Sequence, residues 1–268
     1  MSTSPAQRPL ALITGASSGI GLELARQFAE HGFDLVVTAE DAELPGAAEG
    51  LRRDGAGVTA VRVDLAKAGA VDELYATVRA TGRPLAAAAL NAGVGAGGAF
   101  ATDTDLGDEL RLVDLNVRST VHLAKYVVRD MVARDEGRIL FTSSIASTMP
   151  GAFQAVYNAS KSFVQSLALA LREELKDTGV TVTSLMPGPT DTEFFERADM
   201  LDTRIGQGPK DDPADVARQG FEALMSDDER VVAAGAKTKL QGHASHVLPD
   251  SVKARMHRKM AEPGEGKR

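Results

Sequence analysis

Two residues four positions apart, Tyr157 and Lys161, are the strongest candidates for chemistry in this chain. That spacing places both side chains on one face of a helix. A tyrosine phenol ordinarily has a pKa of about 10, and a nearby ammonium favours the phenolate, so we expect Lys161 to lower the pKa of Tyr157 toward neutrality. Ser144 lies a short distance upstream, in Ser143-Ser144. Tyr-x-x-x-Lys pairs also occur on ordinary solvated helix faces, so the pair alone assigns no function.

A glycine-rich turn near the N-terminus supplies a second functional signal. It follows an apolar run and reads Thr14-Gly15-Ala16-Ser17-Ser18-Gly19-Ile20-Gly21. Glycines allow a sharp turn and a close approach of the backbone to a ligand, and the helix N-terminus that follows offers free N–H groups to a pyrophosphate. Because the turn stands between a predicted strand and a predicted helix, it indicates a dinucleotide site rather than an ordinary tight turn.

The elements that must position these residues alternate along the chain. Short apolar runs predict strands at 10–14, 34–38, 58–63, 85–90, 138–142, 180–185 and 230–233, and amphipathic patterns predict helices up to about 31 and at 42–54, 69–80, 105–134 and 154–177. This rhythm predicts an α/β fold, a doubly wound parallel sheet of Rossmann type with about seven strands and helices on both faces. We expect one domain over 1–268, disordered tails at 1–8 and 261–268, and a substrate loop at 187–212, which is rich in proline and glycine.

Three further strand ends contribute candidate cofactor contacts. The second predicted strand ends at Thr38-Ala39-Glu40-Asp41, where Glu40 could accept a hydrogen bond from a ribose 2′-hydroxyl and would repel a 2′-phosphate. This favours NAD over NADP, although acidic residues at this place also suit a helix start. Asp64, followed by Leu65, could reach the adenine amino group or cap the next helix. The small residues of Asn91-Ala92-Gly93 allow a cofactor to pass close to the backbone, or form a plain turn.

Composition excludes several other classes of protein. The 268 residues contain no cysteine, which rules out disulfides, thiol catalysis and thiolate metal sites, and we expect no metal. The formal net charge of −7 disfavours nucleic acid as a partner. No apolar run approaches the length of a membrane span, and no apolar signal segment opens the chain. A cytoplasmic protein is the simplest interpretation.

Taken together, these residues resemble the short-chain dehydrogenase/reductase family, in its compact single-domain subgroup, over roughly residues 8–235. The resemblance rests on the glycine turn, Asn91-Ala92-Gly93, Asn116, Ser144, Tyr157, Lys161 and Pro187-Gly188. It implies that Tyr157 is the general acid and base, that Ser144 holds the substrate oxygen, and that Lys161 keeps Tyr157 acidic and binds the nicotinamide ribose. It further implies that Asn116 supports a proton-relaying water. Pro187, Gly188, Thr190 and Thr192 are then expected beside the nicotinamide.

The resemblance also bears on substrate and assembly. It implies an oxidoreductase acting on a carbonyl or secondary alcohol. The competing hypothesis is a non-catalytic regulatory protein that binds the nucleotide without turning it over. Apolar residues in the flanking loops either line a substrate wall or pack the loops down: Met149, Phe153, Phe194, Phe195, Met200, Leu201 and Ile205. Members usually pair through the helices predicted here at 105–134 and 154–177, so a homodimer or homotetramer is expected. The basic stretch 237–268 predicts a solvated or partner-contacting helix rather than a membrane-bound one.

Overall fold

The computed structural model describes residues 7–233 and 248–266. Seven parallel strands form one sheet in the order β3-β2-β1-β4-β5-β6-β7. The strands are β1 Leu10–Thr14, β2 Asp34–Ala39, β3 Val58–Arg62, β4 Leu85–Leu90, β5 Gly137–Thr142, β6 Val180–Pro187 and β7 Arg230–Ala233. The chain winds outward from β1 in one direction and then from β4 in the other, which creates a switch point between β1 and β4. The predicted fold class is confirmed.

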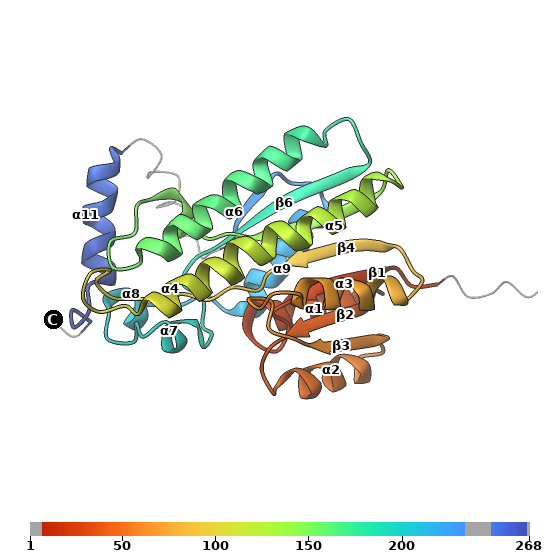
Figure 1. Cartoon of the computed structure of the whole chain (residues 1–268), viewed down its shortest axis with the longest axis horizontal. Helices are drawn as coiled ribbons and strands as arrows, with labels where there is room; N and C mark the ends of the chain where they lie inside the picture. The colour runs from red at the N-terminus through yellow and green to blue at the C-terminus, as the bar shows by residue number, and fades with distance from the viewer. Residues whose placement is uncertain (1–6, 234–247, 267–268) are drawn as a thin grey trace, which may run out of the picture.

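Helices cover both faces of the sheet (Figure 1). One face carries α1 Gly19–Glu30, α2 Leu44–Arg53 and α9 Pro213–Met225, and the other carries α3 Ala70–Ala80, α5 Thr120–Val132 and α6 Ala155–Glu174. Successive strand residues feed opposite layers, because side chains alternate along a strand. Leu12 packs with the α3 layer, and its neighbour Ile13 packs with the α1 layer.

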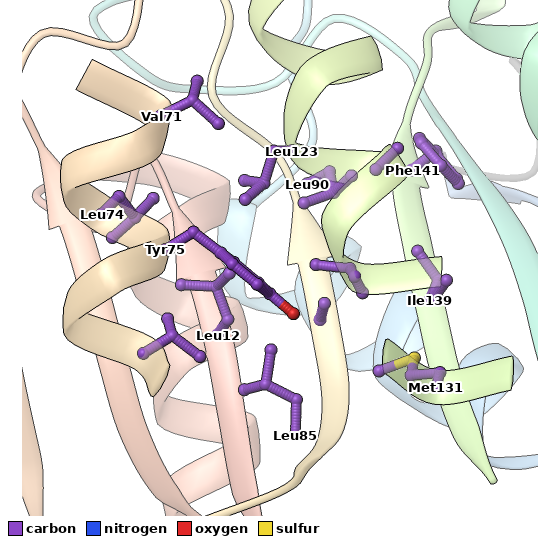
Figure 2. Close-up of a cluster of buried hydrophobic side chains, with 14 of the residues drawn as sticks. Leu12, Val71, Leu74, Tyr75, Leu85, Leu90, Leu123, Met131, Ile139 and Phe141 are labelled. Carbon is purple, nitrogen blue, oxygen red and sulfur yellow. The ribbon is translucent and has the colours of Figure 1, made fainter. Parts of the chain in front are cut away.

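Figure 2 shows the layer beneath α3 and α5, where hydrophobic side chains from β1, β4 and β5 meet those of the two helices. The central strand β4 reads Leu-Ala-Ala-Ala-Ala-Leu, and its alanines 87–89 are fully buried. Ala87 and Ala89 belong to one layer and Ala88 to the other. The local sequence alone does not decide whether this alanine-rich run forms a strand or a helix. The β-α alternation of the chain and burial on both faces of the sheet favour the strand.

The predicted helix over 105–134 has three parts. They are α4 Leu106–Val113, a π-helical turn over Asp114–Ser119 and α5 Thr120–Val132. A π-turn inserts one extra residue into the helical ladder and occurs frequently at functional sites. Here it lies at Asn116, whose side chain bonds another segment.

The loop after β6 and the C-terminal helix lie together at one end of the molecule (Figure 1). The loop contains the short helices α7 Phe194–Arg197 and α8 Arg204–Gln207, and α11 Asp250–Ala261 packs on α8. Within the expected disordered tail 261–268, residues 262–266 instead lie against this loop. The backbone N–H groups of Gly264 and Gly266 donate to Asp202. Three predicted segments lie partly outside the described residues. These parts are residues 267–268 of this tail, residues 1–6 of the expected N-terminal tail and residues 237–247 of the basic stretch.

Candidate active site

One cavity at the carboxyl ends of the strands collects nearly every candidate residue. Of the predicted site, only Asn116 does not line it. The lining residues include Gly15, Ser17, Ser18, Gly19, Ile20, Gly21, Glu40, Asp64, Leu65, Asn91, Ala92, Gly93, Ser144, Tyr157, Lys161, Pro187, Gly188, Thr190 and Thr192. Strand ends converge there because the sheet is parallel, and the cavity spans the switch point between β1 and β4.

The glycine turn has the shape that a pyrophosphate requires. Gly15 and Gly19 adopt φ angles of 67° and 52°, where a side chain is strained. A Cβ on Gly21 would stand 1.9 Å from the Gly15 carbonyl oxygen, so the turn cannot close with a larger residue. Ser18, the N-cap of α1, makes no side-chain cap bond, which leaves the first N–H groups of the helix available to an anion. These features fit a dinucleotide.

Asn91 does more than form a plain turn. Its Nδ2 donates to the carbonyl of Thr14 (3.1 Å), and its Oδ1 accepts from the hydroxyl of Thr142 (3.1 Å). The hydroxyl oxygen of Thr14 in turn accepts from the backbone N–H groups of Asn91 and Ala92, both at 2.9 Å. These bonds tie the ends of β1, β4 and β5 together, and thereby fix the floor of the cavity.

The adenosine end of the cavity contains a cation that sequence spacing does not reveal. Arg111 of α4 places Nη2 at 2.5 Å from Oε2 of Glu40 and Nη1 at 2.8 Å from Oδ2 of Asp64. Asp64 also accepts from the N–H of Ala66. Burial raises the pKa of Asp64, but the bonds from Arg111 and Ala66 outweigh it, so the pKa is lowered. The Asp64 carboxylate is therefore held ionised, and Arg111 orients both carboxylates at the cavity rim.

Tyr157 is buried at the start of α6, and Ser144 hydrogen-bonds its hydroxyl. Burial raises the pKa of Tyr157 to about 12, and the bond to Ser144 lowers it only in part. The expectation that Lys161 brings this pKa down is therefore wrong. The physical reason is that burial disfavours the phenolate, while the Lys161 amine bonds the Thr142 carbonyl rather than the hydroxyl and does not offset that cost.

Lys161 approaches the ring of Tyr157 but is bonded elsewhere. Its Nζ lies 5.9 Å from the ring centroid and donates to the carbonyl oxygen of Thr142 at 3.0 Å. Burial lowers the pKa of Lys161 to about 8. A Cβ on Gly93 would come within 3.2 Å of Nζ, so the glycine preserves the space around the amine.

Asn116 lies behind the cavity, in the π-turn. Its Oδ1 accepts from the N–H of Val94 (3.0 Å), and its Nδ2 donates to the Val94 carbonyl (2.9 Å) and to Oγ of Ser160 (3.1 Å). Ser160 donates to the carbonyl of Tyr157. Asn116 thus connects the segment after β4 to the helix that carries Tyr157 and Lys161.

The segment after β6 closes one side of the cavity. A Cβ on Gly19 would stand 2.9 Å from Cγ2 of Thr192, so this segment lies directly on the glycine turn. Thr190 donates its hydroxyl to the Gly188 carbonyl at 3.0 Å. The apolar loop residues were expected either to line a substrate wall or to pack the loops down, and the structure shows both. Met149, Phe194, Phe195 and Ile205 line the cavity, Phe153 and Met200 pack the loop, and Leu201 is exposed.

The lining residues that the sequence does not predict as site residues include Asp41, Gln154, His257 and Met260. The last two come from α11, about a hundred positions after Tyr157, and no motif marks them. Asp41 follows Glu40 directly, and its carboxylate accepts a hydrogen bond from the hydroxyl of Ser17 at 2.8 Å. Among residues 7–233 and 248–266, no cluster of histidines and acids could hold a metal, and no helix is long and apolar enough to span a membrane.

Comparison with known proteins places the chain in a family. The family model for short chain dehydrogenases matches residues 9–200. The oxidoreductase UcpA of Salmonella typhimurium is 29% identical, with 90% of this chain and 95% of that protein covered. A short-chain dehydrogenase/reductase from Burkholderia phymatum in complex with NAD has a TM-score of 0.80 at 26% identity, covering 89% of this chain and 93% of the other. A short-chain dehydrogenase from Sphingobium yanoikuyae in complex with NADPH has a TM-score of 0.78 at 28% identity, with 90% and 96% covered. The chain therefore belongs to the short-chain dehydrogenase/reductase family of NAD(P)-dependent oxidoreductases.

Proposed function

We propose that this protein transfers a hydride between a nicotinamide cofactor and a carbonyl or secondary alcohol, with Tyr157 as the proton donor and acceptor. The observation that carries the proposal is the buried Tyr157 hydroxyl, hydrogen-bonded by Ser144 in the same cavity as the glycine turn. The cofactor, when bound, supplies or accepts the hydride. The chain itself supplies position and a proton.

Each polar group around the substrate oxygen has a separate task. The Ser144 hydroxyl holds the oxygen, and Tyr157 donates its proton in reduction or removes the hydroxyl proton in oxidation. With a pKa of about 12, the phenol is protonated at neutral pH and ready to act as the acid. The amine of Lys161 binds ribose hydroxyls. Asn116 bonds both Val94 and Ser160 of α6, and thereby positions the helix that carries Lys161. We place the pyrophosphate at Gly15–Gly21 and the nicotinamide beside Thr190 and Thr192.

We propose NAD as the preferred cofactor. Support comes from the Glu40 carboxylate on the rim, where one oxygen is engaged by Arg111 and the other remains for a ribose hydroxyl. The relatives do not decide this point, since one structural neighbour is complexed with NAD and another with NADPH. Comparison of kcat/KM for the two cofactors tests the preference, and a wild-type enzyme that favours NADP contradicts it.

The reaction is tested by following reduced-nicotinamide absorbance with a panel of ketones and secondary alcohols, using both cofactors. Replacing the acid, in Tyr157→Phe, is expected to lower turnover by roughly 10²- to 10⁴-fold while cofactor binding is retained. Tyr126→Phe is the matched control, because its hydroxyl bonds Asp72 on the exposed surface. Near-normal turnover in Tyr157→Phe contradicts the assignment. Cofactor binding without turnover of any panel member by the wild type supports a regulatory protein instead.

We further propose a homodimer or homotetramer that pairs through α4, α5 and α6. Exposed apolar side chains gather on these helices: Leu106, Leu110, Val113, Val121 and Phe163. Leu106 and Leu110 are 70% and 55% exposed. Contact of apolar side chains with water is unfavourable, and burial against a second copy of the chain removes it. Leu110→Glu should shift the mass measured by light scattering toward the monomer. A monomeric wild type contradicts the proposal. A cytoplasmic location remains a prediction from the sequence.

A further inference from the structure

The C-terminal helix α11 delivers a buried histidine to the substrate end of the cavity. His257 is 3% exposed and lines the cavity together with Met260 of the same helix. The proposed hydride and proton transfers do not use it. In Figure 1, α11 stands beside α8, at the end of the molecule that also holds α7.

One ring nitrogen of His257 is already committed. Nδ1 lies 2.9 Å from the carbonyl oxygen of Ala152, in the loop that precedes α6. A carbonyl can only accept, so Nδ1 must carry the proton. Burial lowers the pKa of His257, so the ring is neutral at physiological pH. The other nitrogen, Nε2, therefore presents a lone pair and no proton.

That lone pair is available to a ligand. Within the described part of the chain, no residue hydrogen-bonds Nε2. Among the described residues, several buried side-chain nitrogen and oxygen atoms have no hydrogen-bond partner and no solvent contact. Nε2 of His257 is not one of these atoms. Nε2 is therefore unpartnered and not fully enclosed, and His257 lines the cavity.

The cavity that His257 lines has many apolar residues. Met149, Phe194, Phe195, Ile205 and Met260 contribute to the lining. Several polar groups of the same wall are used within the protein. Glu193 pairs with Arg197, Thr192 accepts from the N–H of Phe194, and the Gln154 amide donates to Met200. The remaining amide oxygen of Gln154 is, like Nε2, an acceptor.

We propose that His257 is a substrate-specificity residue, which accepts a hydrogen bond from a hydroxyl group that the substrate carries away from its reacting carbon. The substrate class is then a largely apolar hydroxyketone, or the corresponding diol. This inference rests on the proposed function, because it names the substrate of the same site. An apolar wall with neutral acceptors at His257 and Gln154 suits such a molecule. A substrate without the hydroxyl leaves the acceptor buried and unpaired, which is unfavourable.

The test compares three ketones on one apolar scaffold: a hydroxyketone, its methyl ether and its deoxy form. A series of scaffolds varies the distance between hydroxyl and carbonyl. For at least one scaffold, the wild type should prefer the hydroxyketone over both analogues by about tenfold in kcat/KM. Equal kcat/KM for all three forms on every scaffold overturns the inference but leaves the oxidoreductase proposal standing. Turnover of no ketone or alcohol overturns the proposed function itself, and this inference with it.

Two substitutions separate recognition from a merely structural role. His257→Asn retains a donor near the position of Nδ1 for Ala152 but removes Nε2. We expect the tenfold preference to fall to about one, with kcat/KM for the methyl ether changed by less than about twofold. His257→Gln retains an acceptor near the position of Nε2 and should keep part of the preference. An unchanged preference in His257→Asn, or an equal loss with all three ketones, overturns the inference.

Discussion

Arg111 and Glu40 form an ion pair at the adenosine end of the cavity, 71 positions apart in the chain and 2.5 Å apart in space. The same guanidinium bonds Asp64. The rim of the site is therefore not the purely acidic surface that the sequence around Glu40 indicates. A cofactor 2′-phosphate would meet a cation as well as two carboxylates, so the preference between NAD and NADP depends on the balance of all three.

Opposite substitutions in this pair should move cofactor preference in opposite directions. Arg111→Met leaves two carboxylates without their cation, so the NAD/NADP ratio of kcat/KM should rise by roughly three- to tenfold at low salt. Glu40→Gln frees the cation for a 2′-phosphate, so the ratio should fall by a similar factor. The ratios are measured at two salt concentrations, because screening weakens both effects. If both variants change the ratio in the same direction, the guanidinium does not act on the cofactor.

The two directions of the reaction should respond differently to pH. Burial raises the pKa of Tyr157 to about 12, so the acid for carbonyl reduction is loaded throughout the neutral range. Oxidation needs the phenolate, whose population grows with pH. We expect reduction to be nearly flat between about pH 6 and 9 and alcohol oxidation to increase over the same range.

Ser144 provides the internal check on this assignment. Its hydrogen bond lowers the pKa of Tyr157, so Ser144→Ala should move the rise in oxidation rate to higher pH. The quantity to compare is the pH dependence of kcat/KM, rather than its value at one pH, because loss of the oxygen-holding hydroxyl lowers the rate at every pH. A rise displaced to lower pH contradicts the proposed arrangement.

In the absence of cofactor, the buried amine of Lys161 should lower the stability of the folded protein relative to an uncharged residue at this position. Burial lowers its pKa from 10.5 to about 8. Between these values the unfolded chain binds more protons than the folded one, so stability rises with pH from about 8 to 10.5, and the cost is fully present below pH 8. Lys161→Met removes the buried charge and should raise Tm at pH 7 by several degrees. The gain should shrink as the pH rises above 8.

The matched control is Lys176→Met, an exposed lysine just beyond the end of α6. Thermal unfolding of both variants is followed without cofactor from pH 6 to 10. If Lys161→Met is destabilising at pH 7, the bond from Nζ to the Thr142 carbonyl is worth more than the desolvation it offsets. That result contradicts the prediction.

The sequence predicted the strands well because strands buried on both faces appear as continuous apolar runs. The alanines of β4 needed the rhythm of the whole chain, since four alanines between two leucines suit a helix equally well. The glycine turn and Tyr157 were identifiable because their chemistry requires fixed residue types at fixed short spacings. Boundaries of helices differed by one to a few residues, as at α2 and α6.

Contacts between distant segments could not be predicted in this way. The π-turn at Asn116 accompanies bonds to Val94, and no local pattern signals them. Arg111 appears in the sequence as an ordinary helix residue, because Glu40 and Asp64 approach it only in the folded sheet. His257 stood in a tail noted for its positive charge, yet burial gives it a different role. The sequence predicted a lowered pKa for Tyr157, and this prediction is wrong because desolvation depends on packing that residue spacing does not reveal.

Gly21 should be the least replaceable residue of the pyrophosphate turn. A Cβ there would stand 1.9 Å from the Gly15 carbonyl oxygen and 2.6 Å from Nδ2 of Asn91, so Gly21→Ala must displace the turn. We expect cofactor affinity to fall by at least about tenfold, because a shift of this size removes the close approach of α1 to the phosphates. Affinity is measured by quenching or enhancement of reduced-cofactor fluorescence.

Gly46→Ala is the matched control, since nothing lies within 4 Å of a Cβ built at this position in α2. Alanine in a helix interior is favoured over glycine by roughly 0.5–1 kcal/mol, so this variant should gain stability and bind cofactor as the wild type does. The contrast separates helix propensity from sterics at the turn. If Gly21→Ala binds cofactor normally, the turn can relax around a methyl group, and the pyrophosphate does not depend on the close packing of Gly21 against Gly15.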